Sequence, residues 1–164
     1  MTDGSTQIKP TRLTAETELR LQAELEDLTT RGRVEIAQAI ESARALGDLS
    51  ENGDYHAAKD AQGKMESRIR QLSALLKNVE LVETGGGDGT VVAGSTVTLR
   101  YEGDDEDDVQ RFFVGSIEEH RDGMSVVSPS APLGLALLGH QAGETVEFKA
   151  PAAPLRVVIV KVGD

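Results

Sequence analysis

The chain has 164 residues, of which 38% are hydrophobic, 27% charged and only 3% aromatic. This length fits one or two small domains, and the hydrophobic content is too high for a wholly disordered chain. The formal net charge of −11 would repel a phosphate backbone on average, which argues against tight sequence-specific binding of nucleic acid. The absence of Cys excludes disulfides, thiolate nucleophiles and Cys-based zinc sites. No apolar run reaches the ~20 residues that span a bilayer, and no signal peptide opens the sequence, so we expect a cytoplasmic protein without a membrane partner.

The N-terminal part predicts a polar arm and then a long helix. Residues 1–12 are polar and contain Gly and Pro, which favours a loose N-terminal arm. Thr14 is a suitable N-cap for the helix that follows. Apolar residues then recur in steps of three and four on either side of Gly32, which costs a helix roughly 1 kcal/mol relative to Ala. Gly47 is the expected end of this helix.

A second helical pattern begins after the polar turn at residues 47–55. Apolar residues from Met65 to Val79 alternate steps of four and three, which is the spacing of a coiled-coil seam. Two seams joined by a short turn predict an antiparallel coiled-coil hairpin over residues 13–83. Its first helix of about 34 residues would be roughly 50 Å long, so we expect the turn to be held far from the globular part. Because the seam is satisfied within the hairpin, we expect a monomer.

The C-terminal part predicts a small β-rich domain. Residues 84–90, TGGGDGT, have the composition of a flexible linker. Within residues 91–164, runs rich in Val, Ile, Phe and Thr predict an antiparallel sheet, and the apolar segment Leu133–Leu138 predicts one or two helical turns. The fold class is therefore α+β. The expected strands are Val97–Tyr101, Val109–Ile117, Met124–Val127, Thr145–Lys149 and Leu155–Val162.

The turn carries three carboxylates, Asp48, Glu51 and Asp54, within seven residues. Such groups repel one another unless a cation or a basic partner is near. Mg²⁺ is commonly held by one or two carboxylates, with waters and partner ligands completing the shell. The turn is too sparse for a self-sufficient Mg²⁺ site, but it fits one half of a site that another protein completes. The same residue types also favour turns and helix caps, so chemistry alone leaves a purely structural turn open.

Two sequence motifs carry a resemblance to a known family. Residues 47–63, GDLSENGDYHAAKDAQG, resemble the hairpin-tip signature of the GreA/GreB transcript cleavage factors. Residues 128–139, SPSAPLGLALLG, resemble the C-terminal signature of that family. The two motifs are far apart and in the family's order, and the resemblance extends from Leu13 to about Val162. It implies that residues 91–164 form an FKBP-like domain that docks on RNA polymerase, and that the hairpin enters the secondary channel of the polymerase.

The resemblance also implies a function for the tip. Members of the family stimulate the polymerase's own active site to cleave the extruded 3′ end of backtracked nascent RNA, and are not themselves enzymes. The two key tip acids of the family match Asp48 and Glu51. Asp48 is expected to share a second Mg²⁺ with the polymerase, as in two-metal hydrolysis. Glu51 is expected to orient or deprotonate the attacking water.

Further candidate residues follow from the same resemblance. Tyr55 either contacts RNA by stacking and supports the tip, or packs across the hairpin. Four basic residues are candidates to face RNA, although they also fit a solvated helix surface with i,i+4 ion pairs. Because the hairpin has so few basic candidates, the resemblance favours GreA-like over GreB-like behaviour. The tip-supporting residues are Ser50, Asn52, Asp54 and Tyr55. The RNA-facing candidates are Arg44, Lys64, Arg68 and Arg70. The polymerase-docking candidates are Ser128, Pro129, Ser130, Pro132, Leu133 and Gly134.

The sequence departs from the family pattern at three places and leaves alternatives open. Arg31-Gly32-Arg33 replaces a common Arg-Pro, Gly53 replaces a common Ala, and Asp54 replaces a frequent Glu. The main alternative is a regulator that occupies the secondary channel without causing cleavage. A prefoldin-like chaperone fits less well because the tip is acidic, and a self-contained metallonuclease fits least because the ligands are too few.

Overall fold

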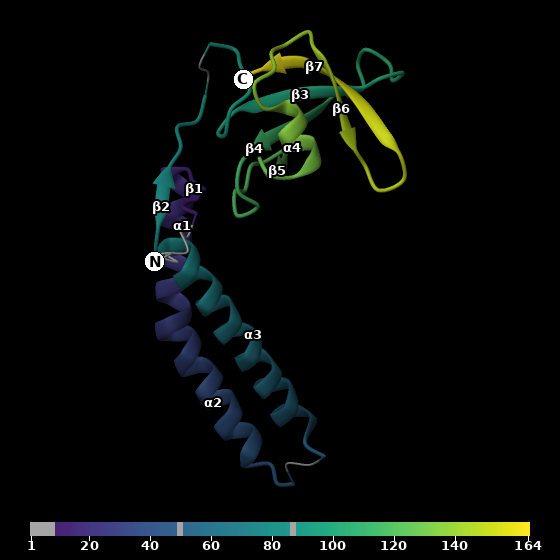
Figure 1. Cartoon of the computed structure of the whole chain (residues 1–164). Helices are drawn as coiled ribbons and strands as arrows, with labels where there is room; N and C mark the ends of the chain where they lie inside the picture. Colours follow the sequence, from purple (N-terminus) through teal and green to yellow (C-terminus); the bar gives the residue numbers. More distant parts are fainter. Residues whose placement is uncertain (1–8, 49–50, 86–87) are drawn as a thin grey trace, which may run out of the picture. The chain divides into compact units, whose positions relative to one another are not determined.

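The computed structural model describes residues 9–48, 51–85 and 88–164. They divide into two compact units. One is a helical hairpin over residues 18–79, and the other is a β-rich unit made of residues 11–17 together with residues 80–164 (Figure 1). Within the described ranges, no helix is both long and apolar enough to cross a membrane.

The hairpin consists of two antiparallel helical arms (Figure 1). The first arm comprises α1 (Ala15–Asp27), the π-helical segment η1 (Leu28–Gly32) and α2 (Arg33–Arg44). The second arm is α3 (Gly53–Leu76). The predicted apolar seam lies between the arms. Its buried side chains are Leu21, Ile40 and Ala43 from the first arm and Ala58, Ile69 and Leu72 from the second.

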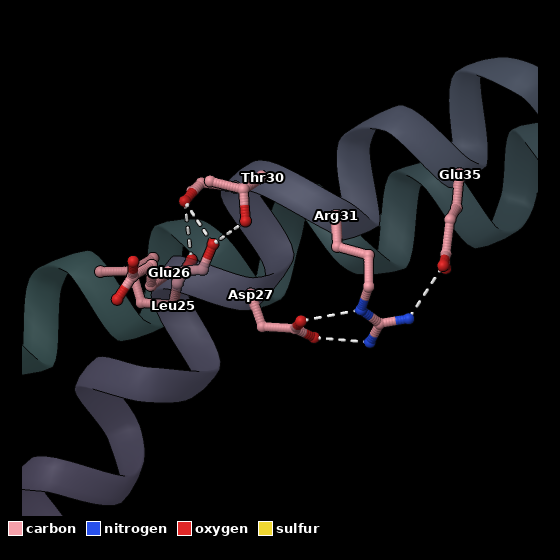
Figure 2. A network of polar contacts seen from close by, with 7 residues as sticks. Leu25, Glu26, Asp27, Thr30, Arg31 and Glu35 are labelled. Atoms are coloured by element: carbon pink, nitrogen blue, oxygen red, sulfur yellow. Dashed lines mark hydrogen bonds and ion pairs between the residues drawn. The ribbon is translucent and has the colours of Figure 1, made fainter.

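The π-helical segment replaces the regular helix that the sequence predicts here. Thr29 Oγ1 donates to the carbonyl of Leu25 at 2.8 Å, and Thr30 Oγ1 donates to that of Glu26 at 2.7 Å. Figure 2 shows these bonds on the surface of the first arm. Threonines that bond back to the preceding turn compete with the helical ladder and bend helices. A Cβ at Gly32 would lie 3.1 Å from Met65 Sδ, so the second arm packs closely against the end of this segment.

Ion pairs join the two arms of the hairpin. Arg33 makes two bonds to the carboxylate of Glu66, at 3.0 and 3.1 Å. Arg68 makes two bonds to the carboxylate of Glu24, at 2.7 and 3.0 Å. Bidentate pairs of this kind fix geometry as well as adding energy. They therefore hold the register between the first arm and α3.

A short two-stranded sheet corrects two predicted boundaries. Strand β1 (Thr11–Leu13) pairs with β2 (Val79–Leu81), and Val82 N donates to Leu13 O at 2.9 Å. Residues 11 and 12 therefore belong to a strand and not to the expected arm, and Val79 belongs to a strand and not to the helical seam.

The β-rich unit contains a five-stranded sheet in the order β5-β4-β3-β7-β6. It confirms the predicted α+β class, but the sheet is mixed, because β4 and β5 run parallel. The reason is that residues 115–124 cross over between these strands, where a hairpin turn would have made them antiparallel. The strands are β3 (Thr96–Tyr101), β4 (Gln110–Val114), β5 (Ser125–Val127), β6 (Thr145–Lys149) and β7 (Pro154–Val162).

Helix α4 (Pro132–Leu137) packs on the aliphatic core of this sheet, with Leu137 fully buried. The close approach of α4 to the preceding loop requires glycine: a Cβ at Gly134 would lie 1.9 Å from Ser128 O. The predicted linker at residues 84–90 includes residues 86 and 87, which lie outside the described residues. The buried core consists of Val91, Val97, Leu99, Val114, Val127, Leu137, Val146, Val157 and Ile159.

Candidate functional site at the hairpin tip

The tip forms where α2 ends and α3 begins. Gly47 follows α2 with φ of 117°, a left-handed conformation that ends helices and favours glycine. Asn52 is the N-cap of α3. Ser50, expected to support the turn, lies outside the described residues.

Asn52 closes the ends of both helices with one side chain. Its Nδ2 donates to the carbonyl of Ala43 at 2.6 Å, and its Oδ1 accepts from the backbone N–H of Tyr55 at 3.1 Å. The first contact gives a second donor to a carbonyl in the last turn of α2 that also accepts from Leu46 N at 3.2 Å, and the second satisfies an N–H in the first turn of α3. The tip is thus braced from inside by an amide that both donates and accepts.

The three tip acids surround an open depression. Asp48, Glu51 and Asp54 are exposed and line it together with Leu46, Asn52 and Gly53. Asp54 lies in the first turn of α3, where the helix dipole favours an acid. In the described part of the chain, no group of three or more His, Cys, Asp or Glu side chains is arranged to hold a metal ion. Carboxylate oxygens are the donors that Mg²⁺ prefers, so the tip offers oxygen ligands but too few to complete the shell of such an ion.

Leu46 is a tip residue that sequence reasoning missed. Its side chain is 70% exposed, although it lies beside the acids. Leu46 follows Ala43 by three residues, which is a normal seam spacing, so periodicity alone gives no sign of its exposure. The tip therefore presents an apolar side chain as well as carboxylates.

Tyr55 packs across the hairpin. The Arg44 guanidinium carbon lies 5.8 Å from the centre of the Tyr55 ring, within the range of a cation–π contact. His56 meets the same ring edge-on, with ring centres 5.7 Å apart. The contact places one cation and one aromatic ring next to the acidic tip.

The other basic candidates differ in their surroundings. Lys64 pairs with Asp60 at 3.0 Å, one turn away on α3, and Arg70 is exposed. Arg68 is partly buried and pairs with the Glu24 carboxylate. The hydrogen bond from Arg68 holds the pKa of Glu24 below its ordinary value, although burial of Glu24 opposes the shift. The structure thus gives Arg68 a role inside the hairpin.

The docking candidates lie where β5 leads into α4. The hydroxyl oxygens of Ser128 and Ser130 are 2.9 Å apart, and Pro132 begins the helix. Pro132 and Leu133 line a mostly apolar depression together with Phe148 and neighbouring residues. Gly134 is buried, so it shapes this loop and does not itself face a partner.

Comparison with known proteins gives matches along most of the chain. Residues 11–81 match the family model "Transcription elongation factor, N-terminal" of GreA/GreB, and residues 86–164 match the model "Transcription elongation factor, GreA/GreB, C-term". The transcription elongation factor GreA of Streptomyces coelicolor is 43% identical over 152 residues, which is 92% of each chain. GreA of Chloroflexus aurantiacus is 44% identical over 156 residues, 94% of this chain and 98% of its own.

Among solved structures, the GreA factor homolog 1 (Gfh1) of Thermus thermophilus is 24% identical. The alignment covers 95% of this chain and 100% of that one, with a TM-score of 0.42, which is too low to carry an argument. The sequence matches decide the assignment, because the two family models together cover residues 11–81 and 86–164, and the two relatives cover 92% and 94% of this chain. The chain belongs to the GreA/GreB family of transcription elongation factors.

Proposed function

We propose that this protein stimulates RNA polymerase to cleave its own backtracked transcript. The hairpin enters the secondary channel of the polymerase, the β-rich unit docks outside it, and the tip reaches the extruded 3′ end of the nascent RNA. The observation that carries the proposal is the pair of exposed acids Asp48 and Glu51 on a tip that Asn52 braces. Cleavage releases a short 3′ fragment and leaves a new 3′ end from which elongation resumes.

The two acids have separate roles in this proposal. An Mg²⁺ ion shared with the polymerase would supply charge neutralisation at the scissile phosphate. The Asp48 carboxylate offers oxygen ligands for that ion. The Glu51 carboxylate orients the attacking water and accepts its proton as the new bond from water oxygen to phosphorus forms and the bond to the 3′ oxygen breaks.

The chain itself is not the enzyme in this account. One or two tip carboxylates supply fewer ligands than Mg²⁺ takes, and the remainder must come from the polymerase, the RNA and water. The reaction therefore requires both proteins. We infer that the factor acts as a monomer, in the cytoplasm where the polymerase works.

The surroundings of the acids suit RNA. Arg44 and Tyr55 form a cationic and aromatic pair beside the tip, and unstacked bases bind to aromatic rings and guanidinium planes. Lys64 and Arg70 lie on exposed positions of α3, where they would attract the RNA backbone. For the β-rich unit, the exposed part of the loop from Ser128 to Leu133 is the proposed contact with the polymerase.

The test uses backtracked elongation complexes with 3′-labelled RNA in Mg²⁺. Addition of the factor should release short 3′ fragments rapidly, while the factor with the same free RNA should release none. Slowed elongation without fragment release would contradict the proposal and leave a regulator that only occupies the channel. Cleavage of free RNA would instead show that the chain is itself a nuclease.

A further inference from the structure

A carboxylate is buried in the β-rich unit, far along the sequence from the tip. Glu119 is only 2% exposed and lies in the crossover of residues 115–124. Burying a carboxylate is costly unless hydrogen bonds compensate. The partners of Glu119 therefore indicate what the burial achieves.

These partners are at the start of α1. The Thr14 backbone N–H donates to Glu119 Oε1 at 2.9 Å. The hydroxyls of Thr14 and Thr17 donate to Oε2 at 3.1 and 2.6 Å. Thr14 also caps the helix locally, because its Oγ1 accepts from Thr17 N at 3.3 Å. Glu119 thus adds a charged cap, supplied from 105 residues away, to a helix end that attracts negative charge.

The loop that carries Glu119 is itself held to the sheet. Arg121 Nη2 lies 3.7 Å from Glu119 Oε2. The guanidinium carbon of Arg121 lies 4.6 Å from the centre of the Phe113 ring, and Phe113 is buried in β4. A continuous set of contacts therefore runs from β4 through Arg121 and Glu119 to the first turn of α1.

The same segment has a second attachment, through the pairing of β1 with β2. Residues 11–17 accordingly belong to the same compact unit as the sheet. Helix α1 continues without a break beyond Thr17, and the chain then runs through η1 and α2 to the tip acids. The first turn of α1 is therefore joined to the end of α2, just before the tip, by consecutive helical segments.

We infer that Glu119 is a positioning residue for transcript cleavage, because it clamps the first turn of α1 to the β-rich unit. The inference rests on the proposed function. Docking of the β-rich unit on the polymerase then restricts the arm that carries Asp48 and Glu51. Loss of the clamp should leave docking intact and make the acids reach the scissile phosphate less often.

The test compares Glu119→Gln and Thr17→Val with wild type in backtracked complexes. Glu119→Gln removes the carboxylate that accepts from the hydroxyls of Thr14 and Thr17, and Thr17→Val removes one of those hydroxyls. Neither change alters the side-chain size by much. The affinity for polymerase should change by less than about twofold, whereas the cleavage rate at saturating factor should fall by about tenfold, since misplacement of a reacting group is costly. Thr17→Ser keeps the hydroxyl and should restore the wild-type rate. Asp122→Asn changes an exposed acid in the same loop and should have no effect.

Hydrogen exchange shows directly whether the clamp is lost. The amide of Thr14, which donates to Glu119, should exchange faster in Glu119→Gln and Thr17→Val than in wild type. Faster exchange with an unchanged cleavage rate would overturn the positioning role while leaving the proposed function standing. No stimulation by wild type would overturn the proposed function and this role with it. Thr17→Val keeps the test independent of whether Glu119→Gln folds.

Discussion

Asn52 uses both ends of its amide to join two helices at the tip. The amide nitrogen donates to Ala43 O, and the amide oxygen accepts from Tyr55 N. Neither Asp nor Ser could make both contacts in this way, because a carboxylate cannot donate and a hydroxyl is too short to span both groups. The brace lies between Asp48 and Asp54, so it affects both the stability of the hairpin and the placement of the acids.

Asn52→Ala should destabilise the protein by about 1–2 kcal/mol, because it removes a helix cap and leaves the Ala43 carbonyl without this donor. Asn52→Asp should cost less, since it keeps the acceptor for Tyr55 N and loses only the donor. Urea denaturation followed by circular dichroism measures both values. Equal stability of Asn52→Ala and wild type would show that the brace does not contribute in solution.

Two glycines should respond in opposite directions to alanine. Gly134→Ala should destabilise by about 1–3 kcal/mol or more, because its Cβ would meet the backbone at Ser128 O. Gly63→Ala should stabilise by up to ~1 kcal/mol, because Gly63 lies inside α3 and a Cβ there meets nothing within 4 Å. Thermal denaturation of the two variants compares them under one condition. Similar shifts for both would contradict the packing around Gly134.

At the residue scale, the sequence motif named Asp48 and Glu51 as the candidate acids and Asn52 among their supports, but it did not give the contacts that Asn52 makes. Asp48 and Glu51 follow from a local pattern that one segment contains. The hydrogen bond from Asn52 to Ala43 reaches back nine residues along the chain, and Glu119 contacts residues more than 100 positions away, so no short motif contains these contacts. Leu46 was missed for the opposite reason, because it obeys the helical spacing and is nevertheless exposed.

At the scale of elements, the arms were predictable because their apolar residues repeat at helical spacing. The π-helical segment was not, because the apolar spacing carries no sign of it or of the hydroxyl bonds that Thr29 and Thr30 make to the preceding turn. Figure 2 also shows Arg31 bridging Asp27 and Glu35 along this surface, at 2.7 and 2.9 Å. The parallel pairing of β4 with β5 was missed because strand propensity does not specify direction.

The pair of Glu24 and Arg68 predicts a pH dependence for the hairpin. Arg68 lowers the pKa of Glu24 in the folded protein from its ordinary value of 4.5. A carboxyl with a lowered folded pKa contributes stability that is present above the unfolded pKa and is lost as the pH falls through the folded one. Between about pH 6 and pH 3, Glu24→Gln should therefore lose less stability than wild type.

Urea midpoints at these two pH values test the prediction. Glu26→Gln is the matched control, since it makes the same chemical change at an exposed position of α1, and it should follow wild type. An equal loss of stability in Glu24→Gln and wild type would show that the ion pair does not contribute to the acid sensitivity of the hairpin.

At the scale of the whole molecule, composition and charge excluded more than they identified. A net charge of −11 without Cys argued against a nucleic-acid binder and a thiol enzyme, and the two separated motifs then indicated the family. In the proposed function, the activity depends on a second protein, because one or two tip carboxylates are fewer ligands than Mg²⁺ takes.

The most direct test of the central claim is the rate of RNA cleavage in backtracked complexes at saturating factor and fixed Mg²⁺. Wild type should be compared with Asp48→Asn, Glu51→Gln and the control Glu41→Gln, an exposed position on α2. We expect each tip variant to bind the polymerase with wild-type affinity and to lower the cleavage rate by at least about 100-fold, while the control matches wild type. Wild-type rates with both tip variants would contradict the claim that the tip carboxylates act in the reaction.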